Sequence, residues 1–483
     1  MDEFLHSYEM ESLSLGVTAR KDVIDQVTAF FPKSESHIAG MLHTSQALAA
    51  RREAKEEELS EDDGNASKEV DGDDDNEAAL KSTKRVKDWQ LVIAGNSKEC
   101  FRNRFRNIHM VALAAAILKS KLSGIRVLDF CYNHLGEEHN FDGETETSGE
   151  SEHAHDERKY LLDAAPCLGR LLQSTALYTS TIEELNLSSN RLGGESCSLL
   201  CAALRNNNAT LRKLNLNGNP LRVSGGHAIA QLLTSRECGL EELNIGNTGM
   251  EIENLIAISA ALRGNTTLYA LNLDKPIIKT KEEEAIQHIG KMLQVNETLR
   301  TISLCKHQLT DDGAQVLAER LLNNHTLQCL VLRANHIGAT GASALAALVL
   351  NHASLAQLDL SANRIGDAGA HAFAQVLQRN CSSLSTLALC STYLTDDGLA
   401  AIATACLRVD NPDMNHLQSL LLWGNDFGER SAQLFLELCC DGGRFHEWSV
   451  ETDFLPRTFD GDDRVHVAHK EVMRAAPFAS PKR

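Results

Sequence analysis

Apolar and polar residues alternate through the second half of the chain in a motif that restarts at a fixed interval. The motif, written L-x-x-L-x-L-x-x-N-x-L, occupies residues 327–337 and again residues 355–365, a shift of 28 residues. Its central x-L-x-L stretch has the period of two that indicates a β-strand with one buried face. The stretch AQVLAERLLNN at residues 314–324 has apolar residues at every third or fourth position, which predicts a helix.

Eleven copies of the motif can be counted from the first leucine or isoleucine of each short strand. From Leu185 to Leu387 successive copies are 28 to 31 residues apart, which leaves room for a full helix after each strand. Self-similarity at this period is typical of a leucine-rich repeat. The eleven positions are Leu91, Leu128, Leu185, Leu214, Leu243, Leu271, Ile302, Leu330, Leu358, Leu387 and Leu420.

One such repeat cannot bury its own apolar face, so copies must stack until a continuous core exists. The sequence therefore predicts an α/β fold, a right-handed leucine-rich repeat solenoid or horseshoe. A parallel β-sheet would line its concave face and α-helices its convex face. Such an architecture supplies a binding surface and does not by itself imply a reaction.

The formal net charge of −19 is concentrated in two short segments. Residues 56–77 carry a net charge of −11 and residues 137–157 a net charge of −9, which leaves the rest of the chain close to +1. Segments with so much charge of one sign and so few apolar residues do not fold by themselves. The nearly neutral array argues against a general nucleic-acid surface, which needs a concentrated basic face.

These changes in composition divide the chain into four predicted regions. Residues 1–50 are expected to form a small helical N-terminal region, with Val23, Ile24 and Val27 on one helix face and a second helix near residues 37–48. The remaining regions are an acidic disordered linker at 51–88, the repeat array at 89–440 with a disordered acidic insertion at 137–158, and a C-terminal cap and tail at 441–483. A cap is expected because an open solenoid end exposes apolar surface.

Motifs for catalysis or metal binding are missing from the sequence. It contains no G-x-x-x-x-G-K-[ST] loop, H-E-x-x-H pair or G-x-S-x-G elbow, so we predict neither an enzyme nor a cofactor. Cys439 and Cys440 lack zinc-site spacing, and His153 and His155 form only a weak H-x-H pair. Thirteen cysteines without an N-terminal apolar run indicate free thiols in a reducing compartment, and no apolar run approaches a membrane span of about 20 residues.

The asparagine of the motif is expected to form a buried ladder, because its amide can satisfy backbone groups that the next strand leaves unpaired. Its copies are Asn133, Asn190, Asn219, Asn335, Asn363 and Asn425. Four copies depart from it, with Thr248, Pro276, His307 and Thr392. We expect His307 to replace the ladder asparagine, and we expect a deformed loop at Pro276, which has no donor to give.

Strand alternation predicts which side chains face a partner. If the first leucine of a strand is position i, then i and i+2 point into the core, and i−1, i+1 and i+3 point into the concave groove. The four successive asparagines at i+1 have two interpretations: they bond a partner's backbone, or asparagine is simply common at that position of such repeats. Trp423 also has two: it binds a partner, or it packs on the C-terminal tail. The residues expected in the groove are Asp129, Glu184, Asn186, Lys213, Asn215, Glu242, Asn244, Asn272, Asp274, Ser303, Arg333, Asp359 and Trp423.

The segment IEELNLSSNRLGGESCSLLCAALRNNNATLRKLNLNGNPL resembles the ribonuclease-inhibitor class of leucine-rich repeats. The irregular segments, among them LVIAGNSKECFRNRFR and TDFLPRTFDGDDRVHVAH, resemble one subfamily more specifically, although Arg457 stands where that subfamily has an aromatic residue. The resemblance implies a non-catalytic interaction protein of the cytoplasm and nucleus, including the nucleolus.

The function predicted from the sequence is a scaffold that binds a protein partner of unknown identity through the concave face. The residues imply no small-molecule substrate, no membrane contact and no general nucleic-acid binding. Two alternatives stay open: a GTPase-activating protein of the Ran type, suggested by fold analogy alone, and a structural subunit of a ciliary or flagellar assembly.

Overall fold

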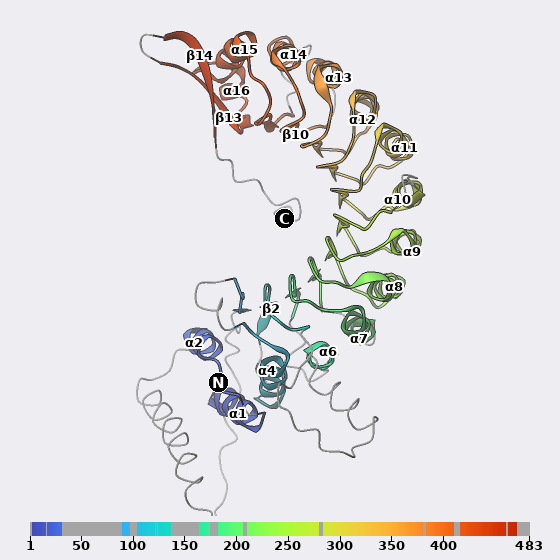
Figure 1. Ribbon diagram of the computed structural model, residues 1–483, viewed down its shortest axis with the longest axis vertical. Helices are drawn as coiled ribbons and strands as arrows, with labels where there is room; N and C mark the ends of the chain where they lie inside the picture. The colour runs from blue at the N-terminus through green and yellow to red at the C-terminus, as the bar shows by residue number, and fades with distance from the viewer. Residues whose placement is uncertain are drawn as a thin grey trace, which may run out of the picture.

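The computed structural model shows a curved array of strands and helices (Figure 1). It describes residues 2–15, 17–30, 89–96, 104–120, 122, 124–136, 164–173, 182–205, 210–279, 284–379, 383–409, 416–459 and 462–470. Several segments lie outside the described residues: the helix expected near 37–48, the acidic segment 51–88, the insertion 137–158 with His153 and His155, and the tail after residue 470.

Twelve parallel strands form one sheet in strict sequence order, each paired in register with the next. The strands are β1 (Trp89–Val92), β2 (Ile125–Asp129), β3 (Glu184–Asn186), β4 (Lys213–Asn215), β5 (Glu242–Asn244), β6 (Ala270–Asn272), β7 (Thr301–Ser303), β8 (Cys329–Val331), β9 (Gln357–Asp359), β10 (Thr386–Ala388), β11 (Ser419–Leu421) and β12 (Glu451–Thr452). The first eleven are the predicted repeat strands. The twelfth was not predicted, because its two residues carry no motif.

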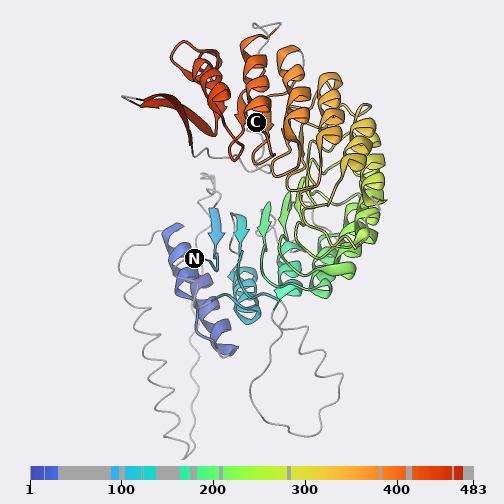
Figure 2. The same ribbon diagram turned by 45° about the horizontal axis from the view of Figure 1, so that its top comes forward.

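A single layer of helices covers the outer side of the sheet (Figures 1 and 2). The helices are α4 (Asn107–Ser120), α6 (Ala164–Gln173), α7 (Gly194–Arg205), α8 (Arg222–Leu233), α9 (Ile252–Leu262), α10 (Glu284–Val295), α11 (Asp311–Leu321), α12 (Ala339–Asn351), α13 (Gly366–Arg379), α14 (Asp396–Leu407) and α15 (Glu429–Cys439). The predicted solenoid, with strands on the concave side and helices on the convex side, is confirmed.

One continuous apolar core runs between the sheet and the helices. The leucines at positions i and i+2 of each strand are buried in it, as Leu358 and Leu360 illustrate. Residues between them point to the other face, where some, such as Asp359, are partly exposed and others, such as Ser303, are buried. The period of two in the sequence therefore translates directly into one buried face and one concave face.

The ladder of motif asparagines is confirmed for all six residues. Each donates from Nδ2 to a carbonyl of its own repeat and to one of the preceding repeat; Asn363, for example, bonds Leu360 O at 2.8 Å and Leu332 O at 3.0 Å. These bonds join adjacent repeats at a buried position, where an unsatisfied carbonyl would be costly. One motif asparagine, Asn96, is exposed and stands outside the ladder.

His307 takes a ladder position, as predicted. Its Nε2–H donates to Leu273 O of the preceding repeat at 2.9 Å, and its backbone N–H donates to Asn335 Oδ1 at 2.8 Å. Burial lowers the pKa of His307 to about 4, and its hydrogen bond to the Leu273 carbonyl and the charge of Asp274 only partly oppose this effect. The imidazole is therefore neutral at pH 7.

A second buried ladder runs along the opposite edge, after the helices, and sequence reasoning missed it. Asn265, Asn296 and Asn324 each donate from Nδ2 to a carbonyl near the end of the helix in the preceding repeat. Each also accepts the backbone N–H groups two and three residues further on. His352 takes the same place, with Nδ1 accepting from Leu355 N–H at 3.1 Å. A recurring N-x-T-L signature at residues 265–268, 296–299 and 324–327 was the available signal.

Two N-terminal helices, α1 (Asp2–Ser14) and α2 (Lys21–Phe30), lie against the first repeat. Val23 and Val27 are fully buried, and α1 packs against α4. Gln26 bonds both backbone groups of Val92 on the outer edge of β1, accepting its N–H at 2.8 Å. The side-chain amide thus occupies the position of a neighbouring strand and blunts an exposed sheet edge.

At the other end, α16 (Arg444–Glu447) and an antiparallel hairpin of β13 (Phe454–Phe459) and β14 (Asp462–His469) follow the last repeat. Phe454 is fully buried, with its ring 4.8 Å from that of Phe435 and 5.2 Å from that of Phe427. The side chain of Asp453 accepts the backbone N–H groups of Leu422 and Trp423. The four-region division of the chain stays a prediction.

Candidate protein-binding face

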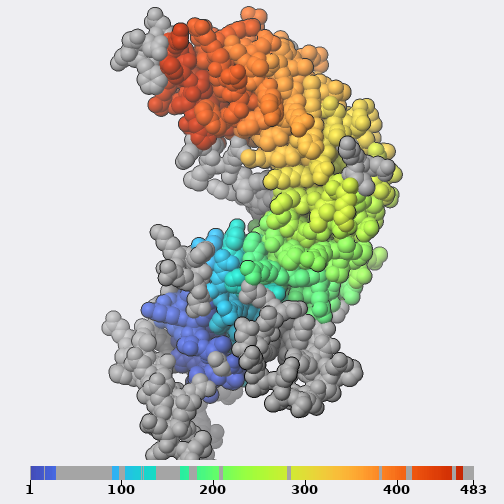
Figure 3. All heavy atoms as spheres, viewed as in Figure 1, coloured from blue at the N-terminus to red at the C-terminus, as the bar shows by residue number. Residues whose placement is uncertain are grey.

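The strands present one side chain per repeat at position i+1, and register places these side chains next to one another. Asn186 pairs with Asn215, Asn215 with Asn244, and Asn244 with Asn272 on adjacent strands. They do not lie in the apolar core, as the alternation predicts. A hollow of about 280 Å³ over β2–β5 is lined by this part of the sheet. Figure 3 shows the inner side of the array as an open, hollowed surface.

Lys213 is held in the hollow by two carboxylates from the neighbouring strands. Its Nζ lies 3.3 Å from Glu184 Oε1 and 3.3 Å from Glu242 Oε1, and the hydroxyl of Tyr269 donates to Glu242 at 2.6 Å. Burial works to lower the pKa of Lys213, but the charges and hydrogen bonds of the two carboxylates outweigh it and raise that pKa. Lys213 is therefore a charged, fixed part of the surface.

Two asparagines of the row carry amide groups that remain available to a partner. Asn215 Oδ1 accepts the N–H of Asn217 at 3.1 Å, and Asn244 Oδ1 accepts the N–H of Gly246 at 3.2 Å. These bonds fix the orientation of each side chain. The Nδ2 groups of Asn215 and Asn244 donate to no described residue, and both side chains are partly exposed to the hollow.

Other polar groove residues use their hydrogen bonds internally. Asn186 Nδ2 donates to Asp129 Oδ2 at 3.0 Å, and Asn272 Nδ2 donates to Asp274 Oδ2 at 3.0 Å. The hydroxyl of Ser303 donates to Asp274 Oδ1 at 2.6 Å, and both Asn272 and Ser303 are buried. These side chains shape the floor of the groove and have little left to offer a partner.

The remaining three predicted groove residues belong to still later repeats, outside the lining of the hollow. Arg333 follows β8 and is exposed, and Asp359 on β9 accepts the N–H of Ser361 at 2.8 Å. Trp423 follows β11, is half-buried, and has its ring 4.9 Å from that of His469 on β14. The geometry thus fits packing of Trp423 on the C-terminal hairpin, one of the two interpretations left open by the sequence.

The described part of the chain offers neither a metal site nor a membrane-spanning helix. No group of three or more His, Cys, Asp or Glu residues there is placed to hold a metal ion. None of the described helices combines the length and apolar character needed to cross a bilayer. The described cysteines form no disulfide. Burial raises the pKa of Cys329 to about 12, with help from the charge of Asp359, so this thiol is not reactive at pH 7.

Comparison with known families identifies the repeats. The family model described as "Leucine Rich repeat" matches residues 179–201, 207–230, 295–318, 323–346 and 351–374. The chain therefore contains leucine-rich repeats. Each match covers one strand and helix of the array, and the sheet continues through repeats that the family model does not match.

Two similar proteins are both called leucine-rich repeat-containing protein 34, the subfamily that the irregular segments resemble. The mouse protein is 35% identical over 72 residues, which is 15% of this chain and 17% of that protein. The human protein is 38% identical over 50 residues, which is 10% of this chain and 11% of that protein. The likeness to this subfamily is therefore partial, and it does not carry the relatives' functions to this leucine-rich repeat protein.

One similar solved structure is the tropomodulin C-terminal domain of Caenorhabditis elegans, at 17% sequence identity. The match covers 32% of this chain and 92% of that domain with a TM-score of 0.27. A likeness at this level carries no argument about this leucine-rich repeat protein.

Proposed function

We propose that this leucine-rich repeat protein is a non-catalytic scaffold that binds a protein partner through the concave hollow over β2–β5. The observation that carries the proposal is the pair of oriented, unused amide donors on Asn215 and Asn244. Each side chain is already fixed by its own backbone bond, so a partner carbonyl can accept from Nδ2 without the cost of ordering a mobile side chain.

The chemistry around these amides favours a polypeptide over a small molecule. Amide donors on adjacent strands lie about 4.8 Å apart and can bond main-chain carbonyls of a segment lying across the sheet. The Lys213 pairing with Glu184 and Glu242 adds a fixed pattern of charge that favours one orientation of the partner. We expect the protein to act in the cytoplasm and nucleus, including the nucleolus.

The two alternative functions remain separable by experiment, and no contact among the described residues favours either. A GTPase-activating protein of the Ran type would accelerate GTP hydrolysis by a Ran-like protein over many turnovers. A structural ciliary or flagellar subunit would stay with the detergent-insoluble axoneme on fractionation.

The double substitution Asn215→Asp and Asn244→Asp should abolish capture of the partner with little effect on folding. Each aspartate keeps the Oδ1 that accepts the backbone N–H, but replaces the unused Nδ2–H donors by an oxygen that repels a carbonyl. At each of the two sites the partner loses a hydrogen bond and gains a repulsive contact, and together these changes should weaken binding at least about tenfold. The measurement is affinity purification with quantitative mass spectrometry, followed by binding of the captured partner in purified form.

The matched control is Asn247→Asp with Asn323→Asp, which makes the same change in net charge at exposed positions away from the hollow. The control should retain the partner that the groove variant loses. If both variants retain it equally, the hollow is not the binding surface. If both lose it equally, net charge and not the Asn215 and Asn244 amides governs the interaction.

A further inference from the structure

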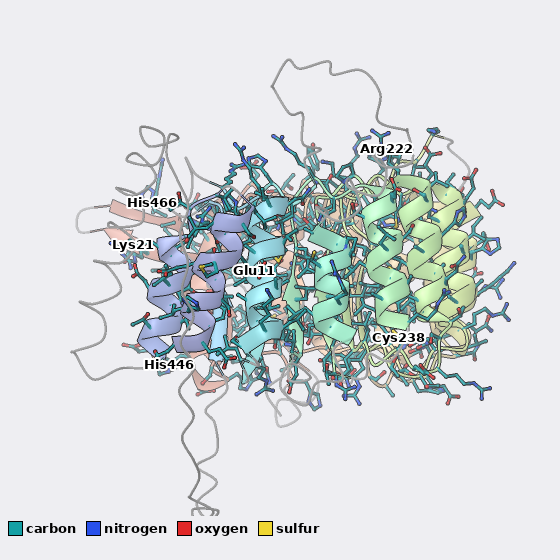
Figure 4. All side chains as sticks on the ribbon, turned by 90° about the horizontal axis from the view of Figure 1, so that it is seen from below. Glu11, Lys21, Arg222, Cys238, His446 and His466 are labelled. Atoms are coloured by element: carbon teal, nitrogen blue, oxygen red, sulfur yellow. The ribbon has the colours of Figure 1, made fainter. Side chains whose placement is uncertain are left out.

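Three cations stand side by side on the edge of the array where the strands end. Lys275, Lys306 and Arg333 follow β6, β7 and β8, and we refer to them as the basic rim. The backbone N–H of Lys275 donates to Cys305 O at 2.8 Å, and the N–H of Lys306 donates to Arg333 O at 3.1 Å. The three residues are thus neighbours in consecutive repeats. Figure 4 labels Arg222 on this same edge and Cys238 on the opposite edge.

The side chains of the basic rim have no ionic partner among the described residues, in contrast to Lys213 with its two carboxylates. All three are exposed. The nearest acid in sequence, Asp274, accepts from the Ser303 hydroxyl, the Asn272 amide and the Cys305 N–H, so its oxygens are already engaged. Three like charges on neighbouring strands repel one another, and no ion pair among the described residues offsets that repulsion.

The fold does not need long cations at these positions. Lys275 and Lys306 have positive φ angles of 56° and 58°, a conformation that costs about 1 kcal/mol or more for a residue with a Cβ atom. Gly218 and Ala362 occupy the equivalent place in other repeats. The lysines therefore add charge at a place where a small residue would serve the backbone equally well or better.

We propose that the basic rim binds an acidic segment of a polypeptide. Carboxylates on alternate residues of an extended chain lie about 6.8 Å apart, within reach of long lysine and arginine side chains on neighbouring strands. A nucleic acid is disfavoured because the three cations of the rim are few for a backbone with closely spaced phosphates. Arg333 is the one predicted groove residue in this surface; the hollow with Asn215 and Asn244 is separate from it.

The direct test uses the full chain and a fluorescein-labelled peptide of twelve glutamates, with fluorescence anisotropy as the readout. The triple charge reversal Lys275→Glu, Lys306→Glu and Arg333→Glu should weaken binding at least about tenfold, since attraction becomes repulsion at three contacts. The matched control reverses Arg236, Arg263 and Lys291, three exposed cations away from the rim. It makes the same change in net charge and should alter binding by less than about twofold.

A carbodiimide, which joins a carboxylate to an amine in contact with it, maps the site independently. The proposal is supported if Lys275 or Lys306 becomes cross-linked to the glutamate peptide. It is also supported if either lysine becomes cross-linked to the acidic residues 56–77 of this chain, and that result identifies the occupant as part of the same chain. Equal loss of binding in both triple variants, or tighter rim-dependent binding of a twelve-nucleotide polyuridine than of the peptide, overturns it. Circular dichroism establishes that each variant is folded.

Discussion

The substitution Leu358→Ala should lower the free energy of unfolding by about 2–5 kcal/mol. Leu358 on β9 lies in the continuous core with only 1% of its surface exposed, and its neighbours belong to stacked repeats that cannot collapse far into a cavity. Urea denaturation followed by circular dichroism measures the loss. Because a solenoid is held together by contacts between neighbouring repeats, hydrogen exchange should show the largest loss of protection in β8, β9 and β10.

The control is the adjacent residue on the opposite face of the same strand. Asp359→Asn keeps the Oδ1 that accepts the Ser361 N–H and should change stability by no more than about 0.5 kcal/mol. A similar loss for Leu358→Ala and Asp359→Asn would mean that the buried and concave faces have been assigned wrongly. Asn272 is not a suitable control, because it is buried and bonded to Asp274, so its truncation should cost more than that of an exposed groove residue.

The sequence predicted the repeat fold because the fold is built from short-range periodicity. Leu330 and Leu358 differ by one repeat in the sequence and pair directly on adjacent strands. The ladder position of His307 could be predicted for the same reason, since the motif fixes a residue's place in the repeat before its chemistry is considered. Which residues share the concave face follows from strand alternation alone.

The details of the candidate site could not be predicted, because they depend on contacts between repeats. The repeat register places Lys213 between Glu184 and Glu242, but the sequence does not indicate that these three side chains form ion pairs or that Tyr269 bonds Glu242. The four asparagines look alike in the sequence, yet only Asn215 and Asn244 keep unused amide donors. The twelfth strand also escaped prediction, since β12 is a two-residue strand held by pairing with β11.

Lowering the pH from 6.5 to 4 should destabilise the protein by about 3 kcal/mol through His307 alone. Burial lowers the pKa of His307 from 6.5 to about 4 in the folded protein. The unfolded chain therefore binds a proton on this residue at higher pH than the folded protein does, and acid favours unfolding. The stabilisation is fully present above about pH 6.5, is lost progressively down to about pH 4, and does not change further below that value; each tenfold change in proton concentration within the window contributes about 1.4 kcal/mol.

The substitution His307→Asn isolates this contribution from that of the carboxylates, which titrate in the same range. Asparagine occupies the equivalent ladder position in six other repeats, so its amide should donate to Leu273 O and keep the ladder intact. The variant then has no titrating group at this position. When the pH falls from 7 to 4, the unfolding free energy of the variant should therefore rise by about 3 kcal/mol relative to that of the wild type. Parallel pH profiles for wild type and His307→Asn would mean that His307 is not buried in the neutral form, and the ladder would then have to be broken in that repeat.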